Sequence, residues 1–502
     1  MLTQTLSAKN LSLTPAAQPL LRELPADLET PISVYLKLSG SHPSFLLESV
    51  TGGEQVARYS FIGVRPNRVY VFEQDCLVVQ TRQGESWQPT RHAIPDGQDP
   101  LDFLRQALAT RRTTPGYGLP RFAGGLVGYM NYEWMRYFEP SVRLQAHPGL
   151  PEAVFLEADT LVAFDHAFGR LILIGNPDPD DPQRSPKAIA ARLDEIESLL
   201  AGPLPPESEA SEPFQADPGR ANMTQAEFEQ AVLAAKEHIA AGDIFQVVLS
   251  QRLQRKTSAA PFEIYRALRR LNPSPYMFYF DFSGPTGLDG LRLIGASPEM
   301  HARLEQRTAS LRPIAGTRRR GKSAEEEACL EAELLADPKE LAEHVMLVDL
   351  GRNDLGRICE YGTVQAPERM VIERYSHVIH LVSHVQGQLR PEYDAFDLLR
   401  ATFPAGTVSG APKIRAMQII NELEKEPRGP YAGVVGYFSY DGSMDTCIAI
   451  RTIVMNGRTA HLQAGAGIVA DSQPANEYQE TLNKVRALAV AIDMAEGAEA
   501  LS

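Results

Sequence analysis

The chain has 502 residues, of which 43% are hydrophobic and 22% are charged. This length is too great for one small core and predicts either two to four lobes or one large composite fold. The formal net charge of -14 would repel nucleic-acid phosphates and anionic lipids, which argues against a nucleic-acid or membrane-surface role.

The cysteines and the N-terminus indicate the cellular compartment. Cys76, Cys329, Cys359 and Cys447 are far apart and form neither a CxxC pair nor a dense disulfide framework. Met1–Pro31 has neither a signal-peptide pattern nor a transit-peptide pattern, and no apolar run approaches membrane-spanning length. We therefore expect a soluble, cytoplasmic protein.

The first part of the chain is predicted to be rich in strands. From Ile32 to about Gly175, short β-branched or aromatic runs alternate with turn residues. Pro31–Leu38 and Arg68–Phe72 are typical of these runs. The breaker Asn176–Pro182 ends this pattern.

A helix and a linker are predicted next. Pro186–Leu200 has the pattern of a helix, and Gly202–Pro213 is polar and proline-rich enough for a mobile linker. We place a domain boundary here, with residues 201–222 as the linker.

Beyond this linker, strand-like segments alternate with helices as far as Val490. Thr224 precedes Glu227 by three residues and opens an apolar-periodic run, a capping-box pattern that predicts a helix ending at Gly242. Closely spaced strand pairs are as frequent as βαβ units, so we predict an α+β fold rather than a doubly wound sheet. The strand-like segments include Phe245–Ser250, Tyr276–Phe280 and Val434–Phe438.

Two predicted helices present carboxylates on one side. In Asp337–Asp354, Glu340 precedes Glu343 by three residues and His344 by four. In Asp471–Lys484, the side chains at helical spacing are Glu477, Glu480 and Lys484. Two facing carboxylate helices would suit Mg2+, although a pair of solvated helix faces is the commoner explanation of such spacing.

A glycine-containing strand precedes the second of these helices. Leu462–Ala470 contains Gly465 and Gly467, whose backbone N–H groups could approach a carboxylate closely. The pattern lacks the third glycine of a dinucleotide site, so a tight turn is an equally good interpretation.

Several cationic or polar residues are candidates for contact with an anion. Arg451 lies in an otherwise apolar strand, where it needs either a ligand carboxylate or an internal Asp or Glu. Tyr431 and Lys413 are further candidates. His377 and His380 lie three residues apart in a predicted strand, so only one of them can face a given site.

Together these segments resemble the chorismate-utilising enzymes, with many motifs in the same order over Pro31–Ala487. The resemblance implies that family's large composite fold, in which packed, mostly antiparallel sheets are flanked by helices. It also implies an N-terminal extension (1–30), an N-terminal regulatory domain that binds tryptophan (31–200), a chorismate-binding catalytic domain (223–490) and a tail (491–502).

The resemblance implies Mg2+ as the cofactor. By motif match its ligands are Glu343 and Glu480, supported by Glu340 and Glu477 through water or as a second layer. The remaining contacts with chorismate are implied for Arg451, Tyr431, Gly465, Ala466, Gly467, Lys484, Gly316 and Thr317.

The implied reaction adds ammonia at C2 of the chorismate ring, expels the C4 hydroxyl and then eliminates pyruvate to leave an aromatic amine. Expulsion of hydroxide needs a proton donor, and Glu299 matches the general acid of the family. His380 matches the base that removes the C2 proton, and Thr317 lies in the same catalytic motif set.

Two positions indicate which branch of the family this chain resembles. Gln246 stands where isochorismate-forming relatives have a lysine that activates water. Ala315, in Pro313–Thr317, stands where aminodeoxychorismate synthases have a nucleophilic lysine, and its presence removes that covalent route. Both substitutions favour the branch that forms anthranilate.

The resemblance also implies a regulator and a partner. Ser49 and the run Pro275, Tyr276 and Met277 match a site for tryptophan as a feedback inhibitor. Because ammonia is mostly ammonium at neutral pH and no cysteine here has the glutaminase nucleophile pattern, a separate glutamine amidotransferase subunit is expected.

Two other interpretations compete with this one. The first is the large subunit of an aminodeoxychorismate synthase, which would give the para rather than the ortho amine. The second is a non-catalytic tryptophan-sensing relative, against which the presence of Glu299, Glu343, His380 and Glu480 argues.

Overall fold

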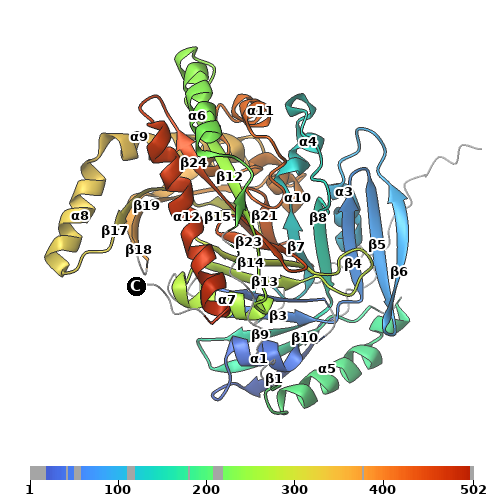
Figure 1. The fold of residues 1–502 in the computed structure, drawn as a ribbon. Coiled ribbons are helices and arrows are strands. Elements are labelled where there is room, and N and C mark those ends of the chain that lie inside the picture. Colours follow the sequence, from blue (N-terminus) through green and yellow to red (C-terminus); the bar gives the residue numbers. More distant parts are fainter. Residues whose placement is uncertain are drawn as a thin grey trace, which may run out of the picture.

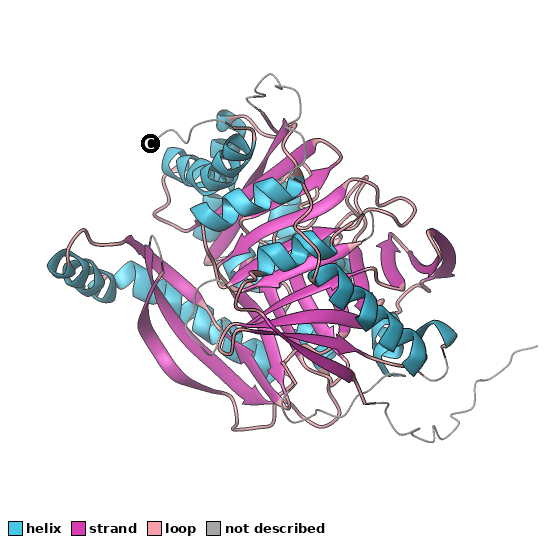
Figure 2. Ribbon diagram, turned by 90° about the horizontal axis from the view of Figure 1, so that it is seen from below, coloured by secondary structure: helices cyan, strands magenta, loops and turns pink. Residues whose placement is uncertain are grey.

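The computed structural model describes residues 18–40, 43–49, 58–109, 119–178, 181–206, 217, 219–375 and 378–497. Two large sheets dominate these residues, with helices over their outer faces (Figures 1 and 2). The strand pairs within both sheets are antiparallel. The predicted α+β fold with packed, mostly antiparallel sheets is confirmed.

The first sheet has twelve strands among the described residues. Its hydrogen-bonded order is β1 (Leu20–Pro25), β10 (Arg170–Gly175), β9 (Thr160–Asp165), β3 (Tyr59–Val64), β2 (Ser44–Glu48), β13 (Tyr276–Asp281), β14 (Leu291–Ser297), β23 (Thr452–Asn456), β24 (Thr459–Ile468), β12 (Gln246–Lys256) and β11 (Arg220–Ala221), with β20 (Gly410–Ala411) also paired to β12.

The second sheet likewise has twelve described strands. Its order is β17 (Ile314–Arg319), β19 (Val378–Gln388), β16 (Thr308–Leu311), β15 (Met300–Glu305), β22 (Met444–Ile448), β21 (Val434–Ser439), β7 (Gly125–Met130), β8 (Ala153–Ala158), β4 (Arg68–Glu73), β5 (Cys76–Gln83) and β6 (Ser86–Ala93), with β18 (Gln365–Arg374) also paired to β19.

Each sheet contains strands from both sides of the predicted linker. In the first sheet β13 pairs with β2, with Met277 opposite Glu48. In the second sheet β21 pairs with β7, with Val435 opposite Tyr129. The predicted domain boundaries therefore divide the sequence without dividing the sheets.

The inner faces of the two sheets share one buried cluster. Phe45 and Phe280 from the first sheet belong to it, as do Val71 and Val127 from the second. Because side chains alternate along each strand, the opposite faces remain free to pack against helices.

The helices cover these outer faces. Across the first sheet, α12 packs on β24 and α7, and α5 packs near β1 and β10 (Figure 1). The helices are α1 (Pro31–Leu38), α3 (Leu101–Ala109), α4 (Met135–Phe138), α5 (Pro186–Leu200), α6 (Gln225–Ala240), α7 (Pro261–Leu271), α8 (Ala324–Ala336), α9 (Pro338–Gly356), α10 (Ala395–Thr402), α11 (Lys413–Leu423) and α12 (Pro474–Ala495). Short 3-10 helices are η1 (Tyr132–Trp134), η2 (Pro140–Val142), η3 (Pro182–Arg184) and η4 (Gly406–Val408).

Local signals fix several of these helices. Thr224 caps α6 and forms the predicted capping box with Glu227, and the helix stops at Ala240, just before Gly242. The predicted helix Pro186–Leu200 is present as α5, with Ser185 as its N-cap.

One segment differs from its prediction. Pro31–Leu38 was expected to be strand-like but forms α1. Thr30 and Ser33 make a reciprocal capping box, and Pro31 occupies the first helical position, where no N–H is needed. These start signals outweigh the β-branched residues that suggested a strand.

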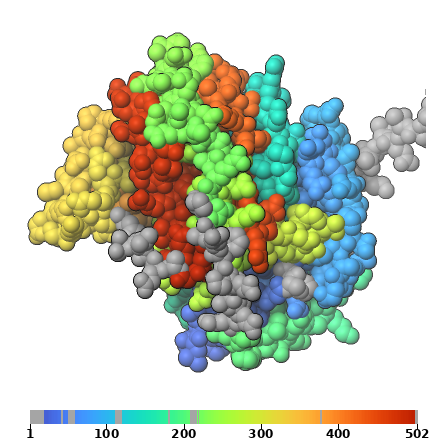
Figure 3. Space-filling model, viewed as in Figure 1, coloured from blue at the N-terminus to red at the C-terminus, as the bar shows by residue number. Residues whose placement is uncertain are grey.

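The part of the chain from β17 to β19 projects from the main body. It holds α8 and α9, and Figures 1 and 3 show α8 at the left edge of the molecule. A small cluster of Leu334, Ile379 and Leu381 packs α8 against the strands. This projecting part carries Gly316, which matters for the site below.

Candidate active site

The two predicted carboxylate helices are α9 and α12. Asp337 caps α9 by accepting hydrogen bonds from the backbone N–H groups of Lys339 and Glu340. Pro474 occupies the first turn of α12. Each helix therefore starts close to its first glutamate, Glu340 in α9 and Glu477 in α12.

The glutamates of these helices lie near enough to influence one another. Burial raises the pKa of Glu343, and the charges of Glu340 and Glu480 raise it further. The side-chain amide of Gln246 opposes this rise by donating a hydrogen bond to Glu343 Oε1 at 3.2 Å. Burial likewise raises the pKa of Glu477, and Glu480 adds to the effect. These carboxylates would therefore be stabilised by a shared cation.

A cation lies beside the carboxylates of each helix, from α12 itself in one case and from β17 in the other. Lys484 Nζ lies 2.7 Å from Glu480 Oε1 on α12. Arg318, on β17, donates to Glu340 Oε1 at 3.0 Å and to Asp337 Oδ2 at 2.8 Å.

His344 does not join this group. Although it follows Glu340 by one helical turn, it is fully buried, and its Nε2 lies 2.6 Å from Ser383 Oγ. Its role is packing of α9 on β19.

The two glycines of β24 sit in the middle of a strand rather than in a turn. Gly465 pairs with Ser250 of β12, and its carbonyl accepts a hydrogen bond from Lys484 Nζ at 2.9 Å. A Cβ at Gly465 would lie 2.7 Å from the Tyr431 hydroxyl, so only glycine fits there. The side chain of Ala466 points to the opposite face and is buried in the cluster beneath α6.

Gly467 faces Gln246. A Cβ added at Gly467 would lie 2.6 Å from Gln246 Nε2, the atom that donates to Glu343. Gln246 thus connects the glycine strand with the carboxylates of α9, and its Oε1 is buried with no hydrogen-bond partner among the described residues.

Arg451 is a partly buried cation that has no salt bridge to a carboxylate in the described part of the chain. Burial lowers its pKa, which the neighbouring Tyr431 and Glu480 partly offset. Its guanidinium donates to the backbone carbonyl of Lys484 at 3.2 Å, and no ion pair among the described residues joins it to a carboxylate. Of the two explanations for this arginine, the structure therefore favours a ligand carboxylate over an internal Asp or Glu.

Tyr431 lies near Arg451. It is buried, and burial raises its pKa to about 12, so its hydroxyl is a neutral hydrogen-bond donor.

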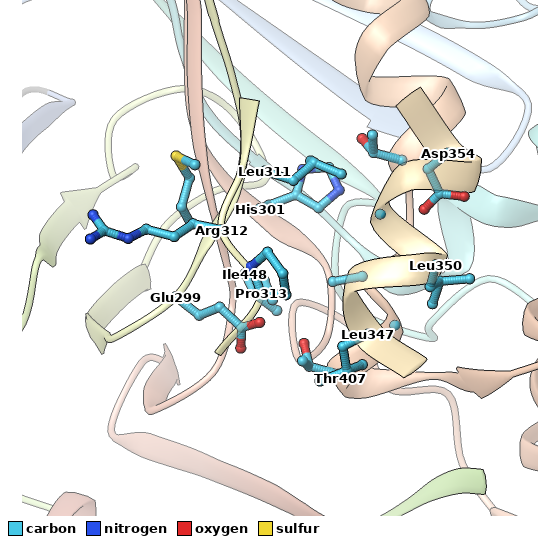
Figure 4. A pocket seen from close by; sticks show the side chains of 15 residues that line it. Glu299, His301, Leu311, Arg312, Pro313, Leu347, Leu350, Asp354, Thr407 and Ile448 are labelled. Atoms are coloured by element: carbon cyan, nitrogen blue, oxygen red, sulfur yellow. The ribbon is translucent and has the colours of Figure 1, made fainter. Parts of the chain in front are cut away.

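Glu299 lies in a cavity beside α9 (Figure 4). The cavity encloses about 420 Å³ of empty space, part of it open to solvent, and Thr407 faces Glu299 across it. Burial raises the pKa of Glu299 to about 8, although Thr407 and the charge of Lys484 oppose the shift. The carboxyl is therefore protonated at neutral pH and can donate a proton.

His380 lies on β19, opposite Thr317 of β17. Its Nδ1 is 3.0 Å from the Gly316 carbonyl and 3.1 Å from the Thr317 hydroxyl. A carbonyl can only accept, so Nδ1 carries the proton and Nε2 keeps its lone pair. Burial lowers the pKa of His380, the Gly316 carbonyl opposes this, and the charge of Arg451 lowers it further. The neutral ring can act as a base.

Long-range charge effects connect these groups across the site. Arg451 influences His380, Glu480 influences Arg451, and Lys484 influences Glu299. The hydrogen bond from Gln246 on β12 to Glu343 on α9 joins the main body to the projecting part at the same place. His377, the other histidine of the predicted pair, lies outside the described residues.

A second cavity contains the residues predicted to bind an inhibitor. Ser49, at the end of β2, lines it together with Pro275, Tyr276 and Met277. Tyr276 donates to Asp445 Oδ1 at 3.0 Å at its base.

The structure decides the open question of Lys413 and adds two residues that the sequence reasoning missed. Lys413 Nζ lies 2.8 Å from the buried Asp354, so it is an internal salt bridge rather than a ligand contact. Thr407 comes from η4 and carried no signal in the sequence. Arg318 directly follows Gly316 and Thr317, a position that could have been noticed.

No group of three or more His, Cys, Asp or Glu side chains in the described part of the chain is close enough to form a complete metal-binding cluster. A search of the same residues also finds no helix long and apolar enough to cross a membrane. All four cysteines are free thiols.

Comparison with known proteins adds to this geometry. Residues 43–490 match the profile of the chorismate binding enzyme family. The chain is 46% identical over 484 residues to anthranilate synthase component 1 of Pseudomonas putida, covering 95% of this chain and 96% of the relative. The component 1 protein of Aquifex aeolicus is 45% identical over 490 residues, covering 95% of each.

Solved structures agree. Anthranilate synthase component I from Streptococcus pneumoniae matches with a TM-score of 0.74 and 37% identity, covering 93% of this chain and 98% of that one. MenF, the menaquinone-specific isochorismate synthase from Escherichia coli, matches with a TM-score of 0.70 at 20% identity, covering 95% of this chain and 96% of that one, which is a likeness of fold.

Proposed function

The chain belongs to the chorismate binding enzyme family, and on this premise we propose that it converts chorismate to anthranilate, as the large component of an anthranilate synthase in tryptophan biosynthesis. The observation that carries the proposal is Arg451, a partly buried guanidinium with no salt bridge to a carboxylate among the described residues, near Tyr431, whose hydroxyl lies against Gly465. A dianionic substrate supplies the missing charge.

We propose Mg2+ as the cofactor. The mutual repulsion of Glu340, Glu343, Glu477 and Glu480 fits a cation between α9 and α12, and carboxylate oxygens are the ligands that Mg2+ prefers. Glu343 and Glu480 would hold it, with Glu340 and Glu477 in support. When bound, the metal supplies positive charge for the ring carboxylate of chorismate.

The other substrate contacts come from both parts of the site. Arg451, Tyr431 and Lys484 bind the second carboxylate, aided by the backbone of Gly465, Ala466 and Gly467. Gly316 and Thr317 line the ring from the projecting part.

The chemistry is divided between two titratable residues. Ammonia attacks C2 of the ring while Glu299 donates its proton to the departing C4 hydroxyl, so that water leaves. Nε2 of His380 then removes the C2 proton, and pyruvate is eliminated. Gln246 has no basic nitrogen to activate water, which fits ammonia as the nucleophile.

We propose that a glutamine amidotransferase component supplies the ammonia and that the complex works in the cytoplasm. The relatives are named as component 1 of their enzymes, which supports a second component. We further propose that tryptophan binds the cavity lined by Ser49, Pro275, Tyr276 and Met277 and inhibits the reaction.

To test the proposed function, chorismate turnover by the purified chain is measured with Mg2+ and ammonium at mildly alkaline pH. Anthranilate fluorescence that decreases on addition of tryptophan is the expected result. The para-amine would instead assign the chain to the aminodeoxychorismate synthases, and no aromatic amine would indicate a non-catalytic sensor.

A second arm tests the metal. Glu480→Gln is expected to abolish turnover without unfolding the chain, because Glu480 is half-exposed, whereas Glu325→Gln on α8 leaves turnover unchanged. Retention of full Mg2+-dependent activity by Glu480→Gln would contradict the metal assignment.

A further inference from the structure

Lys484 is bound to a carboxylate that we assign to the metal. Its Nζ lies 2.7 Å from Glu480 Oε1 and donates to the Gly465 carbonyl at 2.9 Å. An ammonium has three N–H donors, so one is left for another acceptor. Both side chains are partly exposed, 36% for Lys484 and 47% for Glu480, which leaves the pair accessible to solvent ions.

The contact is more than a stabilising pair on one helix. Glu and Lys four residues apart often pair on a helix surface, where they contribute about 0.2–0.5 kcal/mol to helix stability. Here, however, Lys484 is also tied to β24 through Gly465, and its own carbonyl accepts from Arg451. The Lys484 ammonium therefore joins α12 to β24, and the backbone of the same residue contacts Arg451.

The other acidic residues are held differently. Arg318 binds Glu340 together with Asp337 and Glu333, which makes a network of three carboxylates around one guanidinium. Glu343 accepts a hydrogen bond from the uncharged side-chain amide of Gln246. Only the counter-ion of Glu480, within this set of described residues, is a single exposed ammonium that can leave without breaking a network.

We propose that Lys484 is an exchangeable counter-ion: it neutralises Glu480 in the metal-free chain, and the cation that binds Glu480 displaces it toward the substrate carboxylate. Lys484 then keeps the Gly465 carbonyl and has two free N–H donors instead of one, while its backbone carbonyl still accepts from Arg451. By linkage, metal and carboxylate must strengthen each other's binding. The inference rests on the metal site of the proposed function.

The first test is calorimetric titration of Mg2+ into the chain without chorismate. Lys484→Met removes the ammonium that competes with Mg2+ for Glu480. Lys339→Met is the matched control, because Lys339 influences Glu343 and Glu477 electrostatically but makes no salt bridge with a carboxylate among the described residues. An exposed ion pair is worth ~0.2–1 kcal/mol, so Lys484→Met should bind Mg2+ roughly two- to fivefold more tightly than Lys339→Met.

The second test measures linkage with benzoate as the carboxylate probe. In the unmodified chain, Mg2+ should strengthen benzoate binding, and Lys484→Met should lose most of this gain while Lys339→Met keeps it. Equal effects of the two substitutions on Mg2+ affinity, or unchanged linkage in Lys484→Met, would overturn the inference and leave the proposed function intact. Absence of any Mg2+ binding to the unmodified chain would overturn both the inference and the metal assignment.

Discussion

At the scale of single residues, burial sets the chemistry of the site. Glu299 and His380 have the residue types of an acid and a base in the sequence, but their protonation depends on what surrounds them. Burial raises the pKa of Glu299 to about 8 and lowers that of His380, so the carboxyl is protonated and the imidazole neutral at the same pH. The two groups can therefore perform opposite proton transfers.

The raised pKa of Glu299 predicts a pH dependence of stability. The folded chain keeps this proton up to about pH 8, whereas the unfolded chain releases it near the ordinary value of 4.5. The stabilisation is thus complete below about pH 4.5 and is lost as pH rises toward 8. The Glu299→Gln variant has no carboxyl at this position, so this contribution to its stability does not change with pH. The difference in free energy of unfolding between the variant and the unmodified chain should therefore shift by ~1–3 kcal/mol in favour of the variant between pH 5 and pH 8.

Thermal unfolding of both proteins followed by circular dichroism at several pH values measures this difference. Burial also raises the pKa of Glu133 to about 8, but that contribution is present in both proteins and cancels. Melting temperatures that stay parallel from pH 5 to 8 would mean that Glu299 is ionised in the folded chain.

At the scale of elements, buried ion pairs fix helices that surround the site. α9 carries Glu343 near one end and Asp354 near the other, and Asp354 pairs with Lys413 at the start of α11. Lys413 also donates to the Thr402 carbonyl at the end of α10. One ammonium thus joins three helices behind the cavity of Glu299.

Removal of the Lys413 ammonium should lower the free energy of unfolding substantially. Lys413→Met leaves Asp354, which is 5% exposed, as a buried charge without its partner, and we expect a loss of about 3–5 kcal/mol in the free energy of unfolding. Urea unfolding measures the loss. The double variant Lys413→Met with Asp354→Asn is the control and should recover most of it, and a single-variant loss below about 1 kcal/mol would show that the pair is not needed.

At the scale of the whole molecule, both sheets combine strands from distant parts of the sequence. The cavity proposed for tryptophan is a consequence: Ser49 directly follows β2, and Tyr276 and Met277 begin the neighbouring strand β13. Tyr276 also contacts Arg303 of β15, the strand that follows Glu299. A ligand in this cavity would therefore touch strands that lead to Glu299, the proposed acid.

Ser49→Ala should weaken inhibition by tryptophan. Loss of one buried hydrogen bond of about 1–1.5 kcal/mol raises the inhibitory concentration roughly five- to tenfold, while turnover without tryptophan is unchanged. Ser44→Ala is the matched control, because Ser44 lies on the same strand but bonds Tyr35 away from the cavity. Inhibition curves that coincide for the Ser49 variant and the unmodified chain would place tryptophan elsewhere.

The shared sheets also predict how the chain can be divided. Residues 219–497 expressed alone lack β2 and β7, so β13 and β21 lose their neighbours and expose buried faces. We expect this fragment to bind a hydrophobic dye and to unfold without a cooperative transition. The control is the full chain cut at a protease site placed between residues 206 and 217, which should stay assembled; a cooperative transition in the isolated fragment would contradict the expectation.

The sequence by itself determined the local elements and the residue types of the site. Pro and N-cap residues define α5, α6 and α9, because these signals act within a few residues of one another. The motif resemblance predicted the family that the comparisons confirm. The same local reasoning was wrong at Pro31–Leu38, where the cap of α1 outweighed β-branched composition.

Only the tertiary structure decided which groups meet and in which charge state. Arg451, Tyr431 and Lys413 look alike as polar residues in the sequence, yet Lys413 has a buried partner and Arg451 has none among the described residues. Pairing, burial and pKa depend on segments that are far apart in the sequence, such as β17 and α12, and no short-range pattern encodes them. Electrostatics is a property of the folded surroundings, so it could be read only once the chain was folded.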